Sequence, residues 1–425
     1  MLKILRQIWK TTDLRYSVLF VLLMLVIFRV AAHIPIPGVD TVALKDFFDQ
    51  NQVLGMFNVF SGGTMESFSI VALGVGPYIT ASIIFQLLAM IVPRLEEMQK
   101  EGQSGQEKIN QYTRLLTVPL ALLQGYAMIS LLRQTGNGII APSVTLFQMA
   151  MMAITMTTGT VFLMWIGELI SERKIGNGIS IMIFAGIISG MPTTLQQALV
   201  TYDSSQVVVW VAYVAIALAT IAGVVLISEG QRNIPVVYAK RMRGNRSYGG
   251  AETFLPLRVN MAGVIPIIFA ISIILLPPMI GQFFVHAKTQ WLALVAQKTI
   301  ELFQNQLIYG ILYFVFVFGF TYFYTAVIFH PDRVAENLQK QGGYVPGIRP
   351  GRPTAEFIQR TINRIRPAGA FFLAAIAILP IVMQQSLGTQ AMAIGGTSLL
   401  IVVSVVIEIV NQINSQLTMR EYESL

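Results

Sequence analysis

The sequence predicts an all-α polytopic membrane protein with ten transmembrane helices. Hydrophobic residues make up 54% of the 425-residue chain and charged residues only 12%, whereas soluble domains carry about 25% charged residues. Apolar stretches recur that are long enough to cross a hydrocarbon core about 30 Å thick. Most positive charges fall in alternate connections between these stretches, which is typical of membrane proteins whose basic loops stay on one side.

A window of about 19 residues locates the apolar stretches. The fifth, Gly178 to Met191, is too short to cross by itself, and short spans usually lie inside a bundle where protein or water satisfies the backbone. Basic residues ahead of the first stretch imitate a secretory signal peptide, but the many stretches that follow favour a retained anchor. In chain order the ten stretches are 16–34, 70–92, 115–132, 148–169, 178–191, 207–228, 261–285, 307–329, 368–383 and 392–413.

The distribution of Lys and Arg predicts the orientation. Most of the 29 basic residues precede the first span or lie between spans 2 and 3, 4 and 5, 6 and 7, or 8 and 9, or in the C-terminal tail. The positive-inside rule therefore places both termini in the cytoplasm. The alternation also supports the number of spans, because one missed helix would scramble it. The basic residues that fall elsewhere are Arg29, Lys45, Arg133, Lys288 and Lys298.

Two of the predicted cytoplasmic loops, about 229–260 and 330–366, are unusually long, and loops of that length are usually functional or disordered. The second contains residues 342–353, whose Gly and Pro exclude a continuous helix and favour a defined, exposed turn. The positive-inside bias alone explains the basic charge of both loops but not their length. Long basic loops also suit binding to RNA phosphate or to an acidic protein surface.

The segment 55–69, which leads into the second span, has two interpretations. It is amphipathic and is interrupted by the glycine pair Gly62-Gly63. One interpretation is a loop with an interfacial helix on the outer face of the membrane. The other is a re-entrant segment that folds back into a cavity of the protein.

No enzyme, metal or cofactor signature is present. The chain has no cysteine, no GxxxxGK[ST] phosphate loop and no HExxH motif. The ionisable residues within spans lie toward span ends, where long side chains reach polar surroundings. A carrier coupled to protons or ions is expected to place carboxylates near the membrane midplane. A channel is therefore favoured over a secondary transporter of a small solute. A membrane scaffold for cytoplasmic enzymes would explain the long loops but not the short fifth span or the segment 55–69. The span residues in question are Arg29, Glu168, Glu229 and Glu408.

Short motifs along the whole chain resemble the SecY family, the central subunit of the bacterial protein-translocation channel. Each motif is weak alone, but together they follow the family order across all ten spans. They are residues 28–29 with 34–38, 56–58 with 60–63, 77–79 with 82–84, 102–105, 176–180, 259–266, 345–351 and 395–403.

The resemblance implies an hourglass channel that passes unfolded secretory polypeptides. Its two pseudo-symmetric five-helix halves, 1–192 and 193–425, would hinge like a clamshell around an aliphatic ring. A hydrophobic constriction of this kind seals by dewetting, and aliphatic side chains flex around any passing sequence. The positions matching the ring are Val75, Ile79, Ile179, Ile183, Ile268 and Ile401.

The resemblance also implies a plug and a lateral gate. The segment 55–69 would stop the closed pore from the outer side. Spans 2, 3, 7 and 8 would form a gate through which apolar segments leave for lipid, with gate positions at Thr80, Ser272 and Leu276. The plug positions are Phe57, Asn58, Phe60, Ser61, Gly62 and Gly63.

The implied partners bind the long loops or surround the bundle. The SecA ATPase motor and the ribosome, including its RNA, would dock on the loops, with Arg349 coupling to the motor and Arg241, Arg243 and Arg246 as candidates for ribosomal contact. SecE would brace the halves, with SecG beside them. Signal sequences, secretory polypeptides and membrane lipids complete the set, no cofactor is expected, and the location is the bacterial inner membrane.

Overall fold

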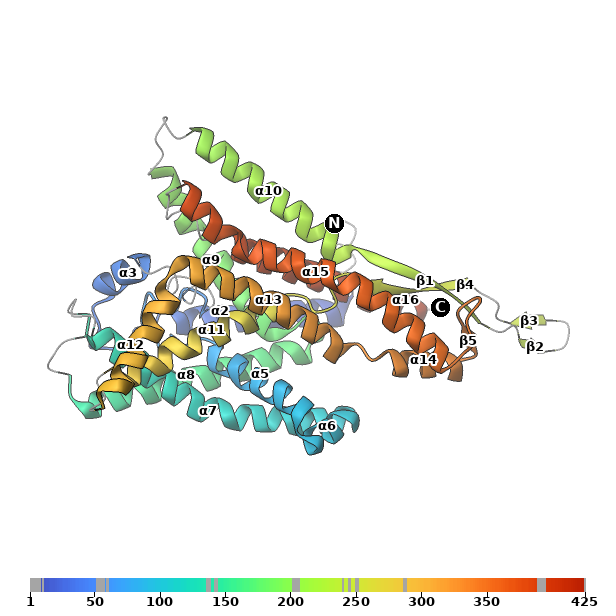
Figure 1. Ribbon diagram of the computed structural model, residues 1–425, viewed down its shortest axis with the longest axis horizontal. Helices are drawn as coiled ribbons and strands as arrows, with labels where there is room; N and C mark the ends of the chain where they lie inside the picture. The colour runs from blue at the N-terminus through green and yellow to red at the C-terminus, as the bar shows by residue number, and fades with distance from the viewer. Residues whose placement is uncertain are drawn as a thin grey trace.

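A computed structural model shows a bundle of long helices with a small sheet at one end (Figure 1). We call the end that carries α6 (Pro93–Lys100), α14 (Pro331–Lys340) and strands β1, β4 and β5 the sheet end. The opposite, far end carries the short helices α3 (Thr41–Gln50) and α12 (Gln290–Gln304). The structure describes residues 9, 11–50, 58, 61–134, 139–140, 144–200, 207–238, 241–243, 246–248, 252–285, 289–387 and 395–423.

Ten helices coincide, in order, with the ten predicted spans. Among the described residues, six helices are long and apolar enough to cross a membrane unaided, and α5 with α6, bent by 106° at their break, would count as a seventh if the pair is one span. Helices α9, α10 and α11 are apolar over shorter lengths. The structure therefore confirms a polytopic, all-α membrane protein. The ten are α2 (Thr12–Ala32), α5 (Gly76–Ile91), α7 (Gln103–Gln134), α8 (Leu146–Glu172), α9 (Gly178–Val200), α10 (Val207–Glu229), α11 (Ile265–Phe284), α13 (Gln306–Ile328), α15 (Arg352–Leu387) and α16 (Gly395–Glu423).

Several predicted boundaries were wrong for physical reasons. Helix α9 continues to Val200, nine residues beyond the predicted end at Met191, because Pro192 lies within the helix without ending it. Hydropathy detects only its apolar part, Gly178–Pro192. The second span begins as a helix only at Gly76 rather than at 70, since positive φ at Gly62 (83°) and Gly74 (56°) breaks helical geometry before it.

The two long loops fold together at the sheet end. Strand β1 (Gln231–Tyr238) pairs antiparallel with β4 (Glu252–Arg258) and with β5 (Gly343–Tyr344), so the sheet joins residues of both loops. A small apolar core beneath the sheet joins them to α14 and the start of α15. These loops were expected to be either functional or disordered, and over the described residues they are ordered. The buried core residues are Ile234, Val236, Leu257, Leu338, Val345, Ile358 and Ile362.

Two sets of helix–helix contacts join the first five spans to the last five. Helices α5 and α7 both pack against α11, and α9 packs against α16. The main apolar core of the bundle spans both sets of helices, whereas a second core joins α7, α8 and the connection after α2. These contacts place residues from distant parts of the sequence around one axis of the bundle.

Candidate functional site

A cavity of about 830 Å³ enters the bundle from the sheet end. The connection from α8 to α9, the connection from β4 to α11 and the middle of α16 supply most of its lining. Its wall carries both charges and amides, including Lys174, Asn177, Glu408 and Asn411. The wall therefore combines polar groups, which can hold water, with apolar side chains such as Val264 and Ile407.

The six positions that match the family ring lie close to this cavity, in the main apolar core of the bundle. Ile179, Ile268 and Ile401 each lie within one helical turn of a cavity-lining residue, namely Asn177, Ile265 and Ser404 respectively. All six positions matching the family ring lie in one apolar cluster: five are buried, and Ile179 is partly buried against them. Four helices or their first residues supply the six side chains. The structure thus brings together side chains separated by more than 300 residues of sequence.

A buried, non-helical segment lies on the far side of this aliphatic cluster. Residues 61–75 form successive turns, and Thr64, Met65, Phe68 and Ser69 are no more than 2% exposed. Backbone hydrogen bonds tie the segment to the connection after α2, from the Ile36 amide to the Phe68 carbonyl and from the Ile70 amide to the Ile34 carbonyl, both 2.9 Å. The re-entrant interpretation of this region fits the structure, and the interpretation as a surface loop does not.

The predicted plug residues are only partly described. Asn58, Ser61 and Gly62 are buried and Gly63 is exposed, whereas Phe57 and Phe60 lie outside the described residues. The Asn58 amide donates to the Glu66 carboxylate at 2.5 Å, which closes the turn across the glycine pair. Their role as a plug stays a prediction.

Helix α9 and the residue before it contact the cavity, the aliphatic cluster and the buried segment in turn. Asn177, just before its first residue, lines the cavity; Ile179 and Ile183 belong to the aliphatic cluster; and Gly186 touches the buried segment at Gly62. One helix and the residue before it therefore contact the cavity, the aliphatic cluster and the buried segment in this order.

Arg29 is a site residue that sequence reasoning did not assign to the segment. Its guanidinium lies in the last turn of α2 and donates to the carbonyls of Gly62 (2.9 Å), Ala185 (2.7 Å) and Gly186 (2.9 Å). The sequence indicated only that a basic side chain near a span end reaches polar groups. Because the acceptors are backbone carbonyls of residues distant in the sequence, no sequence signal pointed to these bonds.

The proposed gate positions lie along the contact of α5 with α11. The Thr80 hydroxyl donates to the Gly76 carbonyl at 3.1 Å, and the Ser272 hydroxyl donates to the Ile268 carbonyl at 2.9 Å. Each hydroxyl is thus satisfied inside its own helix. Leu276 is partly buried on the same helix as Ser272. Because α11 touches α5 and α7, this side of the bundle is closed in the structure.

A second cavity of about 410 Å³ marks the sheet end of the same boundary. Three glutamines line one wall, from α5, α6 and α7, and residues of α13 and α14 line the other. The boundary of α5 and α7 with α11 and α13 is therefore packed in the middle, whereas at the sheet end it contains a cavity lined by polar side chains. The lining includes Gln86, Gln99, Gln106, Tyr324, His330 and Arg333.

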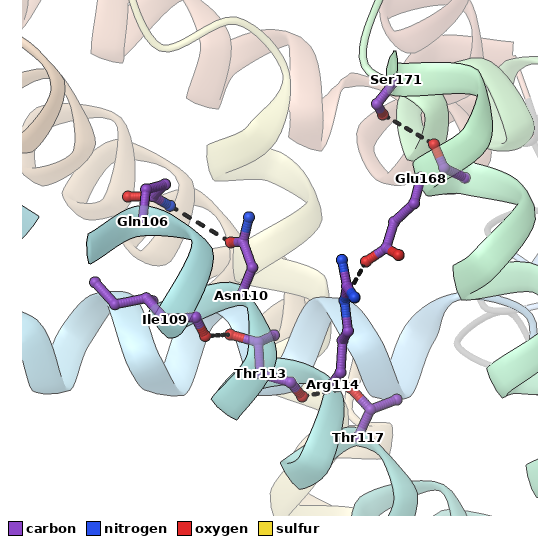
Figure 2. Close-up of polar contacts among 9 residues, drawn as sticks. Gln106, Ile109, Asn110, Thr113, Arg114, Thr117, Glu168 and Ser171 are labelled. Atoms are coloured by element: carbon purple, nitrogen blue, oxygen red, sulfur yellow. Dashed lines mark hydrogen bonds and ion pairs between the residues drawn. The ribbon is translucent and has the colours of Figure 1, made fainter. Parts of the chain in front are cut away.

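An ion pair joins α7 to α8 beside this region. Figure 2 shows the Arg114 side chain reaching across to the Glu168 carboxylate, with a separation of 2.5 Å between Nε and Oε1. The hydroxyls of Thr113 and Thr117 donate to backbone carbonyls one turn earlier on α7. Pairing with Arg114 neutralises a carboxylate that a coupled carrier would need free.

The predicted docking arginines lie on the loops at the sheet end. Arg349 is exposed on a turn between β5 and α15, where the Thr354 hydroxyl donates to its carbonyl at 2.8 Å. Arg241, Arg243 and Arg246 lie on the hairpin of β2 (Arg241–Arg243) and β3 (Arg246–Tyr248), which projects beyond the sheet (Figure 1). The turn and the hairpin are separate projections, so a partner can contact either one alone.

The fold and site define a polytopic helical membrane protein in which buried aliphatic side chains lie between an open cavity and a buried, non-helical segment. The family model described as SecY matches residues 69–410. The chain is 43% identical to the protein translocase subunit SecY of Streptomyces galbus, over 100% of this chain and 99% of that one. It is 45% identical to the subunit of the same name from Corynebacterium glutamicum, over 99% and 98%. The chain belongs to the SecY family.

Solved structures share the fold at low sequence identity. A structure described as a protein-conducting channel superposes with a TM-score of 0.60 at 16% identity, covering 96% of this chain and 92% of that chain. A second, from work on the plug domain of SecY, gives 0.61 at 17% identity, covering 93% and 91%. The arrangement of the helices around the path is therefore common to these proteins.

Proposed function

We propose that this protein is a protein-conducting channel that passes unfolded secretory polypeptides across the membrane. The proposal rests on six aliphatic residues that belong to the main apolar core and lie between the cavity and the buried segment. A ring of aliphatic side chains excludes water and ions when closed. It has no polar group with which to bind a passing chain, so any sequence slides through.

In this proposal, apolar segments would leave sideways at the boundary of α5 and α7 with α11 and α13. Here Thr80, Ser272 and Leu276 would line the exit. A segment of about 20 apolar residues is more stable in lipid than in water, so the gate need only give it access. The first five and last five spans contact each other at this boundary and at α9 with α16. Separation at α5 and α7 from α11, with the contact of α9 and α16 as hinge, would open the gate between the proposed halves, whose division at 192 falls inside α9.

The sheet end is the docking platform in this proposal. A relative by fold, Sec61 in a canine ribosome–channel complex, superposes with a TM-score of 0.55. The SecA motor would bind at Arg349 and the ribosome with its RNA at the β2–β3 hairpin, with SecE and SecG packed against the outside of the bundle. The protein would lie in the bacterial inner membrane with both termini in the cytoplasm, since the basic loops gather at the sheet end.

A secondary transporter of small solutes is not supported. Its curated relatives are translocase subunits, and Glu168 is paired with Arg114. The large cavity is also open at the sheet end and contains no ring of charges in its described lining that would bind one small ion.

Reconstitution tests the proposal directly. We expect proteoliposomes containing the chain with its accessory subunits, supplied with motor and ATP, to render a secretory protein resistant to external protease. The same protein without its signal sequence is expected to remain digested. Saturable uptake of a radiolabelled small solute, together with no protease-protected protein, would contradict the proposal.

A further inference from the structure

The buried segment is held against α9 by direct backbone contact. An ideal Cβ at Gly186 would lie 2.3 Å from the Gly62 Cα, and a Cβ at Gly62 would lie 3.1 Å from the Gly186 Cα. Real Cβ atoms essentially never approach backbone to less than 3.0 Å. Gly62 also has φ +83°, a conformation that residues with side chains rarely adopt. Only glycine at both positions permits this contact.

A second helix receives the segment in the same way. An ideal Cβ at Gly159 of α8 would lie 1.9 Å from the Ile70 carbonyl oxygen. Glycines on α8 and α9 therefore form a shallow seat for residues 61–75. The fit depends on the absence of side chains, so it is specific to this position of the segment.

Arg29 fastens the seated segment. Two of its three hydrogen bonds go to α9, at Ala185 and Gly186, and one goes to the segment, at Gly62. Hydrogen bonds from a charged donor are stronger than those between neutral groups. The bonds to α9 hold the guanidinium in place whether or not the segment is present, so the third donor is already aimed at Gly62.

We propose that Arg29, Gly186 and Gly62 form a latch that holds the segment 61–75 in the closed position and sets how readily the channel opens. This inference rests on the proposed function, because the segment must leave its seat before a polypeptide passes. Release breaks the bond from Arg29 to Gly62 and separates the two glycines. The Arg29 bonds to α9 remain, so α9 keeps its place and the segment can return to the same seat.

The matched test compares two glycines one turn apart on α9. Gly186→Ala places a methyl group against Gly62, whereas at Gly190 an added Cβ meets no described atom within 4 Å outside its own helix backbone and chain neighbours. The natural chain has no cysteine, so Ser61→Cys, at a side chain that is 6% exposed, reports release. The measurement is the rate at which a membrane-impermeant maleimide labels this cysteine in the full chain with its accessory subunits, in proteoliposomes without substrate.

We expect Gly186→Ala to raise the labelling rate by about tenfold or more, because the methyl group displaces Gly62 and breaks its charge-assisted hydrogen bond with Arg29. Gly190→Ala is expected to label at the rate of the parent. Arg29→Lys, which adds no methyl clash and keeps the charge but lacks the fork that spans three carbonyls, is expected to accelerate labelling in the same direction. If Gly186→Ala or Arg29→Lys labels at the rate of Gly190→Ala, the latch is wrong.

Translocation by the parent chain, measured in the same vesicles, separates the two claims. If the parent translocates in a signal-dependent way but Gly186→Ala and Arg29→Lys label at the parental rate, only the latch proposal is overturned. Absent translocation by the parent overturns the proposed function and removes the basis of the latch with it.

Discussion

Exchanging Ile183 for asparagine is expected to make the resting channel leak ions. Ile183 is 2% exposed and lies in the cluster formed by the ring positions. An amide buried there without a partner destabilises the closed state by about 1–3 kcal/mol, which corresponds to a factor of about 5 to 150 in its population. The amide also holds water in the constriction, so dewetting no longer seals it. Single-channel recording without substrate measures the resting conductance.

Ile183→Leu is the control for this prediction. It keeps an aliphatic side chain of equal volume, and such exchanges usually cost less than about 1.5 kcal/mol. We expect it to remain sealed and to translocate at the parental rate. Equal resting conductance for the asparagine and leucine variants would show that Ile183 does not belong to the seal.

Arg349→Glu is expected to abolish motor-driven translocation while leaving the closed channel intact. Arg349 is exposed, and its turn is held by backbone contacts rather than by its side chain. The exchange therefore changes a docking surface without disturbing the fold. An arginine at the centre of an interface contributes about 2 kcal/mol or more, so we expect at least about a 30-fold loss of ATP-dependent translocation. Binding of the purified motor to proteoliposomes measures the same effect.

Arg352→Glu provides the matched control on the same loop. The Arg352 side chain is 90% exposed and forms an ion pair of 3.4 Å with Glu356 one turn along α15. Exposed pairs of this kind contribute little, so we expect nearly normal translocation. Comparable loss in both variants would indicate a general effect of loop charge rather than a specific contact at Arg349.

The spans were predictable because a membrane constrains sequence strongly. A helix must satisfy its backbone internally and present apolar side chains to lipid, so hydropathy located all ten helices. A hydropathy window, however, detects only the apolar part of a helix. It missed the first 16 residues of α15, from Arg352, and the polar continuation of α9 to Val200. Amphipathic helical turns at the ends of spans do not register in a window of about 19 apolar residues.

The layers of the site were less predictable because they depend on contacts between distant residues. Nothing local in Val75 or Ile401 distinguishes a constriction from ordinary packing, and only the family resemblance suggested their roles. The sheet joining the two long loops was not predicted, since β5 contributes only Gly343 and Tyr344. The bond from Arg29 to Gly62 joins residues 33 apart through a backbone carbonyl, which carries no side-chain signature.

The central claim is that a polypeptide passes the aliphatic constriction, and a single cysteine at Ile179 tests it most directly. The natural chain has no other cysteine to react, and Ile179 lies at the edge of the constriction next to the cavity. The measurement is crosslinking to an arrested secretory chain that carries a thiol-reactive probe. We expect a crosslink that requires the signal sequence. An unreactive Ile179 position, together with labelling of cysteines placed on the loops at the sheet end, would contradict it.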